Sequence, residues 1–377
     1  MFCDYFRSLT GTTHPALQRH GDTDPSTPVA CAADNSDTTQ SRSEPTKLRS
    51  KTEAPDGTRS QLMKRIITTS AITFCLLAAT PSLAAANNAR SSFDDGNFVV
   101  FSGLCLANIK AQEFVYDGDH KNSQLNWESK GINLFTVGVD AQIDNDWNVK
   151  SSIEIGTGGT AHMVDYDWDS PGHDDWSRRS IHPLTELGHD VAVAIQLERI
   201  IDGNETTNIT VGAGVQYTDV KWTAYGGSGI YSFGGGFRNN PWKVPDRERG
   251  ISYQQQIPIG FLSLSGKYNI GDLTISGDLQ TGFSFGIKDT DDHWLKYVRF
   301  HDDINPAPTL SATVALDYAM TPAISLDLSG SFQRVFNSRG ETQVEHTKDG
   351  TRSAWRRDAA GANFQTTSIF FGVKATF

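Results

Sequence analysis

Two features are scarce or missing in this 377-residue chain, and each shortage excludes a class of protein. There are only four cysteines, and Cys105 alone lies beyond residue 86, so an exported form has no internal disulfide framework. No segment after residue 90 has the length and apolarity of a membrane-spanning helix. We therefore expect neither a disulfide-stapled domain nor a helical membrane bundle.

Positive charge is also scarce. Residues 1–86 hold 9 of the 33 Lys and Arg and 8 of the 44 Asp and Glu, so the rest of the chain carries a net charge of −12. This balance argues against nucleic acid as a partner and favours cationic substrates.

The first 86 residues differ in composition from the remainder. Residues 1–62 are polar and rich in Ser, Thr, Asp and Pro, which predicts a disordered leader or a mis-annotated start. Met63-Lys64-Arg65 then opens an apolar run that ends in small residues up to Ala86. Basic, apolar and small-residue segments in this order are typical of a secretory signal peptide. We predict a signal peptide over residues 63–86, a start at Met63 and export of the remainder.

The exported part is dominated by alternation of apolar and polar residues. At the C-terminus one face carries Ile369, Phe371, Val373, Ala375 and Phe377. Similar runs recur along the chain and predict about ten antiparallel strands. A soluble β-sandwich also alternates in this way. Export, a final aromatic strand, and short turns that alternate with long polar connections favour a transmembrane β-barrel over residues 87–377.

The long polar connections are predicted at one end of the barrel, which would face outward from the cell because short turns face the periplasm. We expect them at residues 157–189, 223–250, 286–308 and 337–363. Interfacial aromatic girdles are expected to include Trp147, Trp222 and Tyr318.

Two acidic motifs lie in or beside these connections. They are Asp165-Tyr166-Asp167 and Asp291-Asp292-His293, about 120 residues apart. Residues at i and i+2 of a strand share a face, so each motif would present two side chains together. If the fold unites the motifs, three carboxylates and an imidazole could hold and deprotonate a water.

These motifs and their flanks resemble the omptins, a family of Gram-negative outer-membrane aspartyl-type endopeptidases. The resemblance extends over roughly residues 95–377. It rests on the segments Met163 to Trp168, Asp289 to His293, Ser123 to Trp127, Tyr225 to Ser228 and Gly236 to Arg238, together with the C-terminal strand.

The resemblance implies roles for six residues. Asp291 would orient His293 as the general base on a water, and Asp165 and Asp167 would hold that water from the opposite side. Glu113 and Asp289 fall where omptins place the acidic floor that selects Arg or Lys before the scissile bond. Charge-assisted hydrogen bonds would supply this selectivity. The implied function is cleavage of exposed peptides or proteins at basic residues, in the outer membrane and with the active site facing outside.

The family's lipopolysaccharide cluster is only partly present. Tyr217, Asp219 and Lys221 fall at three of its positions, and Gln256 and Asn305 replace two basic ones. Amides offer hydrogen bonds without charge. The requirement for lipopolysaccharide as an activator is therefore expected to be weaker than in the family. We expect no other cofactor and no metal, because no group of potential metal ligands has a convincing spacing.

The inward and outward alternation of the strands conflicts with an inward placement of the two motifs. Continued from Ile153 and Ile155, it would place Asp165 and Asp167 on the outer face, and the second motif would likewise point outward. One-residue bulges would reverse both, with Gly158-Gly159 and Gly286 as the expected positions. Alternatives of another class are a catalytically silent barrel that serves as an adhesin or structural protein and, less well supported, a narrow porin.

Overall fold

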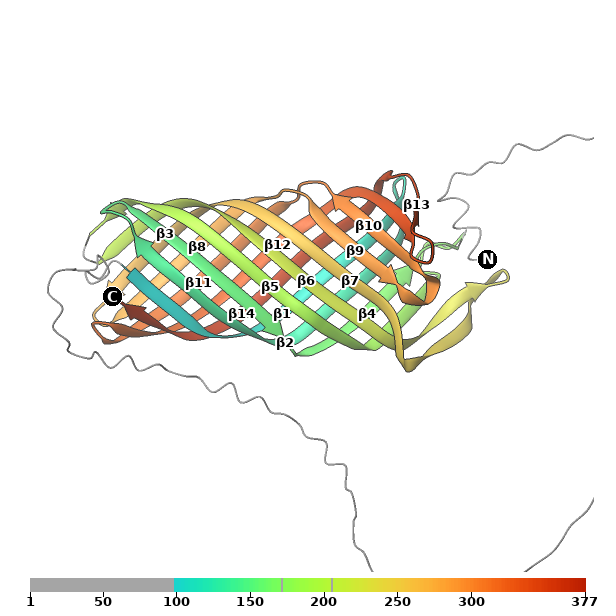
Figure 1. Cartoon of the computed structure of the whole chain (residues 1–377), viewed down its shortest axis with the longest axis horizontal. Helices are drawn as coiled ribbons and strands as arrows, with labels where there is room; N and C mark the ends of the chain where they lie inside the picture. Colours follow the sequence, from blue (N-terminus) through green and yellow to red (C-terminus); the bar gives the residue numbers. More distant parts are fainter. Residues whose placement is uncertain (1–97, 171, 205) are drawn as a thin grey trace, which may run out of the picture. The chain divides into compact units, whose positions relative to one another are not determined.

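The structure, a computed structural model, describes residues 98–377 except Pro171 and Glu205 (Figure 1). The predicted leader (1–62) and signal peptide (63–86) lie outside the described residues. The described part is one antiparallel sheet with a single turn of 3-10 helix, η1 (Trp294–Lys296). The strands are β1 (Phe98–Asp117), β2 (His120–Gln142), β3 (Trp147–Thr157), β4 (Thr160–Asp167), β5 (Arg178–Gly203), β6 (Thr207–Phe233), β7 (Gly236–Ile270), β8 (Leu273–Ser284), β9 (Ile287–His293), β10 (Val298–Ile304), β11 (Pro308–Thr321), β12 (Ile324–His346), β13 (Thr351–Arg352) and β14 (Arg356–Thr376).

The sheet closes on itself into a barrel with ten strand positions around its wall, here called staves. Three staves are interrupted and each contributes two strands, namely β3 with β4, β8 with β9, and β11 with β10. The first and last strands pair directly, from Val99 opposite Thr376 to Val115 opposite Ala360. The prediction of about ten antiparallel strands is confirmed, and the closure excludes an open sandwich.

The outer wall of the barrel is apolar. Leu104 and Leu106 are 65% and 61% exposed on β1, whereas Cys105 and Ala107 between and beside them are buried. Ile369 and Phe371 are exposed in the same way on β14. Apolar side chains that face outward from a closed barrel are typical of a lipid-facing surface. No helix in the described part of the chain is long and apolar enough to cross a membrane.

The two ends of the barrel differ. Short turns and the C-terminus lie at one end, and β9, β10 and β13 lie at the other (Figure 1). The segments predicted as long connections at this second end are mostly strand that continues the barrel wall. The longest non-strand stretch among them is residues 168–177. The acidic motifs therefore lie in β4 and β9 and are held by regular ladder hydrogen bonds.

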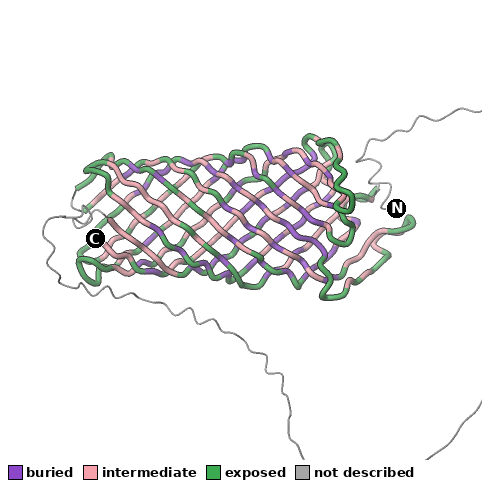
Figure 2. The backbone as a smooth tube through the Cα atoms, in the orientation of Figure 1, coloured by how far each residue is buried: buried purple, intermediate pink, exposed green. Residues whose placement is uncertain are grey.

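Buried residues gather in the half of the barrel away from the C-terminus (Figure 2). Trp127, Trp222 and Tyr253 stack there across the lumen, with ring centroids 5.6 to 6.4 Å apart and exposures of 0 to 1%. The prediction that Trp222 belongs to an interfacial girdle is wrong. Its indole Nε1 instead donates to Ser129 Oγ at 2.8 Å on the facing wall.

Both expected breaks in strand parity are present. β3 ends at Thr157 and β4 begins at Thr160, with Gly158 and Gly159 between them at φ of 78° and 80°. Odd-numbered residues face outward on β3, where Ile155 is 53% exposed, and face inward on β4, where Met163 is fully buried.

Gly286 has the same effect between β8 and β9. Its φ is 94°, and it separates outward Phe285, 67% exposed, from inward Ile287, 0% exposed. Without these glycines, the alternation would carry both motifs to the lipid side. The glycines thus turn both motifs into the barrel.

Gly159→Val is expected to destabilise the barrel by about 2 kcal/mol, because a left-handed residue would be strained. A Cβ there would also lie 2.7 Å from the Lys130 carbonyl oxygen. Urea unfolding in detergent micelles measures the loss. The matched control is Gly266→Val, where a Cβ meets nothing within 4 Å. Equal stability of the two variants would contradict a strained break at Gly159.

Candidate active site

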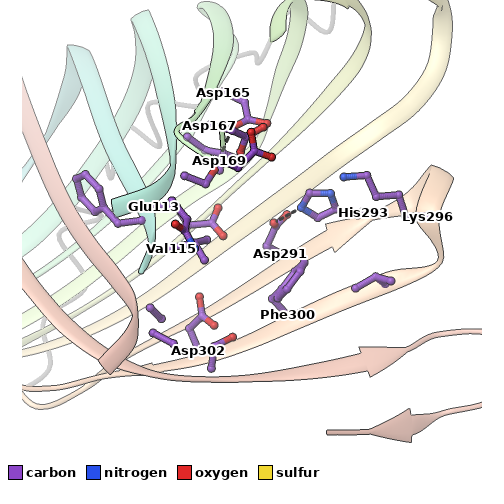
Figure 3. A pocket seen from close by; sticks show the side chains of 18 of the residues that line it. Glu113, Val115, Asp165, Asp167, Asp169, Asp291, His293, Lys296, Phe300 and Asp302 are labelled. Carbon is purple, nitrogen blue, oxygen red and sulfur yellow. Dashed lines mark hydrogen bonds and ion pairs between the residues drawn. The ribbon is translucent and has the colours of Figure 1, made fainter. Parts of the chain in front are cut away.

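A cavity of about 130 Å³ opens inside the barrel at the end away from the C-terminus (Figure 3). Both acidic motifs contribute to its lining, although they lie on staves from different parts of the ring. Its polar lining residues are Glu113, Asn122, Ser123, Asp165, Asp167, Asp169, Arg178, Tyr231, Asp291, His293, Lys296, Asp302, Thr342 and Arg356. Seen from close by, the Asp165 group and His293 face one another across the pocket (Figure 3).

One wall carries a carboxylate–imidazole dyad. His293 Nε2 lies 2.6 Å from Asp291 Oδ2, and the two side chains are 14% and 2% exposed. If neutral His293 donates from Nε2, its Nδ1 keeps the lone pair that can accept a proton. The ring of Phe300 packs edge-on against the imidazole at 5.4 Å. The dyad is thus oriented by a buried acceptor and an aromatic neighbour.

The opposite wall carries the second acidic pair. Asp165 and Asp167 project from the same face of β4, and Ser123 Oγ donates to Asp165 Oδ1 at 3.2 Å. Burial raises the pKa of Asp165 to about 6, although Lys296 opposes this shift. Burial, with the charges of Asp165 and Asp169, raises the pKa of Asp167 to about 8. At neutral pH the pair therefore holds about one proton.

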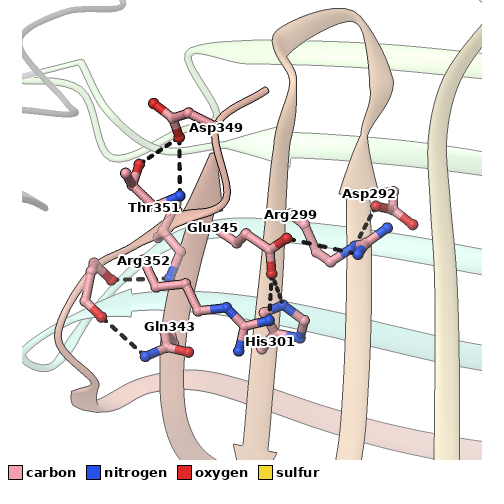
Figure 4. Close-up of polar contacts among 10 residues, drawn as sticks. Asp292, Arg299, His301, Gln343, Glu345, Asp349, Thr351 and Arg352 are labelled. Carbon is pink, nitrogen blue, oxygen red and sulfur yellow. Dashed lines mark hydrogen bonds and ion pairs between the residues drawn. The ribbon is translucent and has the colours of Figure 1, made fainter. Parts of the chain in front are cut away.

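A network of polar side chains on the outer wall supports the β9–β10 hairpin, which carries the dyad (Figure 4). Asp292, between the dyad residues, points the other way and accepts from Arg299 Nε at 2.6 Å. Arg299, His301 and Arg352 lie around Glu345, with the His301 and Arg352 nitrogens 2.8 and 2.7 Å from its Oε2. Asp292 is therefore part of the outer wall and no part of the pocket.

An acidic group forms the floor below the dyad. Glu113 and Asp302 line the pocket, and Asp289 lies directly opposite Asp302 in the β9–β10 ladder, just behind the lining. Tyr253 donates from its hydroxyl to Asp289 Oδ2 at 2.8 Å. Burial raises the pKa of Glu113 and Asp289 well above their ordinary values, and the charges of Asp291 and Asp302 reinforce both shifts. Burial also raises the pKa of Asp302 to about 7.

Unsatisfied oxygens mark this floor. Glu113 Oε2, Asp289 Oδ1 and Asp302 Oδ1 are all buried and accept no hydrogen bond from the described residues. Buried polar atoms are rarely left in this state. Three such acceptors in one place would suit a cationic guest with several donors.

Sequence reasoning missed five charged pocket residues: Asp169, Arg178, Lys296, Asp302 and Arg356. Asp302 had a usable signal, because the Asp291 motif forms a hairpin that pairs Asp302 with Asp289. Arg178 pairs with Asp169 at 2.7 Å and faces Asp167 in the ladder. Such neighbours depend on hairpin register, which spacing alone does not provide.

The residues expected to hold lipopolysaccharide lie on the outer wall of β6 and β7. Tyr217 is 43% exposed, and Asp219 is held by His189, Gln254 and Gln256 at 2.9, 2.8 and 3.3 Å. Lys221 lies two residues along the same face, opposite Gln254. Asn305 lies between β10 and β11, two residues after Asp303, which pairs with Lys288, the ladder partner of Gln256. Gln256 thus donates to Asp219 and brings no positive charge to this surface.

Known proteins with the same features were found by sequence and by structure. The Omptin family profile matches residues 95–377. Protease 7 of Escherichia coli O157:H7 is 28% identical, with 83% of this chain and 98% of that protein covered. The plasminogen activator of Yersinia pestis is 23% identical over 78% of this chain and 94% of its own length. The outer membrane protease IcsP of Shigella flexneri is 28% identical over 62% and 76%.

The fold also has a solved counterpart. The crystal structure of the outer membrane protease OmpT from Escherichia coli superposes with a TM-score of 0.71 at 24% identity. The superposition covers 78% of this chain and all of that one. Profile, relatives and fold all agree over the barrel. The chain therefore belongs to the omptin family of outer-membrane proteases.

Proposed function

We propose that this protein is an endopeptidase that cleaves exposed peptides or proteins after arginine or lysine. The reaction would take place at the outer face of the outer membrane, in the pocket between β4 and β9. The observation that carries the proposal is the convergence of the Asp291–His293 dyad, the Asp165–Asp167 pair and an acidic floor on one cavity. Peptide or protein substrates with basic residues are the proposed partners, and nucleic acid and metal have no part.

The mechanism uses a water between the two walls. His293 Nδ1 takes a proton from the water as its oxygen attacks the scissile carbonyl carbon, and Asp291 stabilises the imidazolium. Asp165 accepts a hydrogen bond from the same water. Protonated Asp167 donates a hydrogen bond to the developing oxyanion, which it can do only while its raised pKa keeps the carboxyl protonated. The proton on His293 then completes the leaving amine.

The proposed specificity comes from the floor. Glu113, Asp289 and Asp302 offer three buried acceptor oxygens to a guanidinium or ammonium group. Ionisation of these acids is disfavoured while the pocket is empty, so a cationic side chain would both satisfy the oxygens and release their protons. Arginine would bind better than lysine because its planar fork supplies five donors.

For lipopolysaccharide, we propose weak engagement at Tyr217, Asp219 and Lys221. Asp219 already has three partners, and Gln256 adds no charge. Activation through this cluster would therefore be modest, since phosphate binding depends on charge-assisted hydrogen bonds.

The test compares two peptides that differ only in charge. The refolded barrel is incubated with a peptide that has arginine before the scissile bond and with the same peptide carrying citrulline, which keeps the shape and loses the charge. We expect kcat/KM to be at least about 100-fold higher for arginine, because two or more charge-assisted hydrogen bonds are lost. Cleavage products identified by mass spectrometry locate the bond. No cleavage of either peptide would favour a catalytically silent barrel.

A further inference from the structure

A second cavity, of about 250 Å³, lies on the outer wall of the barrel. It is lined from β1, β2, β4, β12 and β14, and its polar lining includes Lys110, Gln112, Asn126, Glu128, Arg334 and Asn363. These staves lie about halfway around the ring from β6 and β7, which carry Tyr217, Asp219 and Lys221. The groove is therefore separate from the lipopolysaccharide positions discussed above.

The polar side chains of the groove point away from the lumen. On β1, buried Ala111 and Glu113 face inward, so Lys110 and Gln112 face outward. On β2, Trp127 and Ser129 are buried in the same way. The alternation of a strand then places Glu128 outside.

The groove begins just above the lipid-facing band. Leu106 is 61% exposed on the outer wall, and Lys110 follows four residues further along β1. At ~3.3 Å per residue and a strand tilt of ~40°, Lys110 lies roughly 10 Å above Leu106. Arg334 alternates with Phe332 and Phe336 on the outer face of β12, and its guanidinium lies 5.1 Å from the Phe336 ring. Outward aromatic residues are typical of the headgroup level.

Cations outnumber acids in this groove. Lys110, Lys130 and His162 converge on Glu128, with N–O distances of 2.9, 3.3 and 3.3 Å. The two lysines are 56% and 61% exposed, so their ammonium groups remain open to a ligand. With Arg334 included, three permanent positive charges face a single carboxylate. Such a surplus at headgroup level attracts phosphate.

A ladder of side-chain amides runs beside the cations. Gln112 and Gln124 both donate to Asn126 Oδ1, at 2.6 and 2.7 Å, and Asn363 donates to Gln112 Oε1 at 2.8 Å. Each amide carries two donors and an acceptor, so the ladder keeps hydrogen-bonding capacity outward. Hydroxyl groups of sugars match such a surface, whereas acyl chains do not.

We propose that this groove binds the phosphorylated sugar headgroup of an outer-leaflet glycolipid. Lys110, Lys130 and Arg334 hold the phosphate, and the amides of Gln112, Asn126 and Asn363 hold sugar hydroxyls. The acyl chains then lie along the apolar wall below, past Leu104 and Leu106. This binding is independent of the proteolytic proposal, because the groove opens outside the barrel.

The probe is a synthetic diglucosamine lipid with two phosphates, added to the refolded full barrel in zwitterionic detergent. Native mass spectrometry counts bound lipids, and a titration yields the affinity. The double variant Lys110→Glu with Arg334→Glu is expected to bind one lipid fewer and to lose at least about tenfold in affinity at that step. Lys110→Arg with Arg334→Lys, which keeps both charges, is expected to retain the lipid.

The matched control for net charge is the double variant Lys243→Glu with Arg247→Glu, two exposed residues of β7 away from the groove. Two further arms identify the ligand: the dephosphorylated diglucosamine lipid and free inorganic phosphate, both of which are expected to bind at least tenfold more weakly. Equal stoichiometry for the variant with Lys110→Glu and Arg334→Glu and for the control with Lys243→Glu and Arg247→Glu would overturn the proposal. So would equal affinity for either of these two ligands, since the first removes the need for phosphate and the second the need for a lipid.

Discussion

Replacing His293 with alanine is expected to lower kcat/KM for the arginine peptide by about a thousandfold, because the proposed general base is removed. His301→Ala is the matched control. That imidazole also lies 2.8 Å from a carboxylate, Glu345, on the same hairpin, but on the outer wall. We expect the control to keep its activity within a few-fold. Comparable losses in both variants would indicate damage to the hairpin and count against His293 as base.

The pH profile tests the same mechanism. Activity should fall on the acid side as Asp165, with its pKa of about 6, loses its charge. Activity should fall again on the alkaline side as Asp167, with its pKa of about 8, loses the proton it donates. Asp167→Asn keeps a hydrogen-bond donor at all pH values, so its alkaline fall should disappear. An unchanged alkaline fall in this variant would remove Asp167 from the donor role.

Removing the acidic floor is expected to have the second largest effect. The double variant Glu113→Gln with Asp289→Asn should lower the preference for arginine over citrulline by about 100-fold, because two charged acceptors are lost. Cleavage of the citrulline peptide should change little. If the preference survived, the selecting charge would have to lie elsewhere in the pocket.

The same double variant should be more stable than the natural protein at alkaline pH. Both carboxyls have a pKa raised well above the ordinary value in the fold, so the unfolded chain ionises first as pH rises. Their contribution therefore opposes folding increasingly above the ordinary carboxyl pKa. Urea midpoints at pH 5 and pH 8 measure this, with a larger gain expected at pH 8 than at pH 5. A variant that loses specificity and gains stability would indicate residues kept for function.

The barrel could be predicted because period-two alternation survives in the lipid-facing half. Exposed Leu104 and Leu106 alternate with buried Cys105 and Ala107, because the lipid-facing side of each strand in a barrel must be apolar. Above the membrane that constraint is relaxed. The strands continue there with polar residues on both faces, and the sequence consequently suggested loops where β5, β6 and β7 extend.

The candidate site could be predicted in part. Spacing placed two side chains of each motif together, and paired glycines or a lone glycine suggested where parity breaks, as at Gly159 and Gly286. Asp302 was not predicted as a site residue because its place beside Asp289 depends on the register of one hairpin. Trp222 was misplaced because the strand was predicted to end beside it, whereas β6 continues to Phe233.

The crowded lumen has a consequence for the cell that makes this protein. Below the stacked Trp127, Trp222 and Tyr253, Gln216 and Gln333 exchange two hydrogen bonds across the barrel, at 3.2 and 2.9 Å. A solute would have to break this reciprocal pair and part three aromatic rings to pass. A bacterium could therefore display many copies without making its envelope leaky to antibiotics or bile salts.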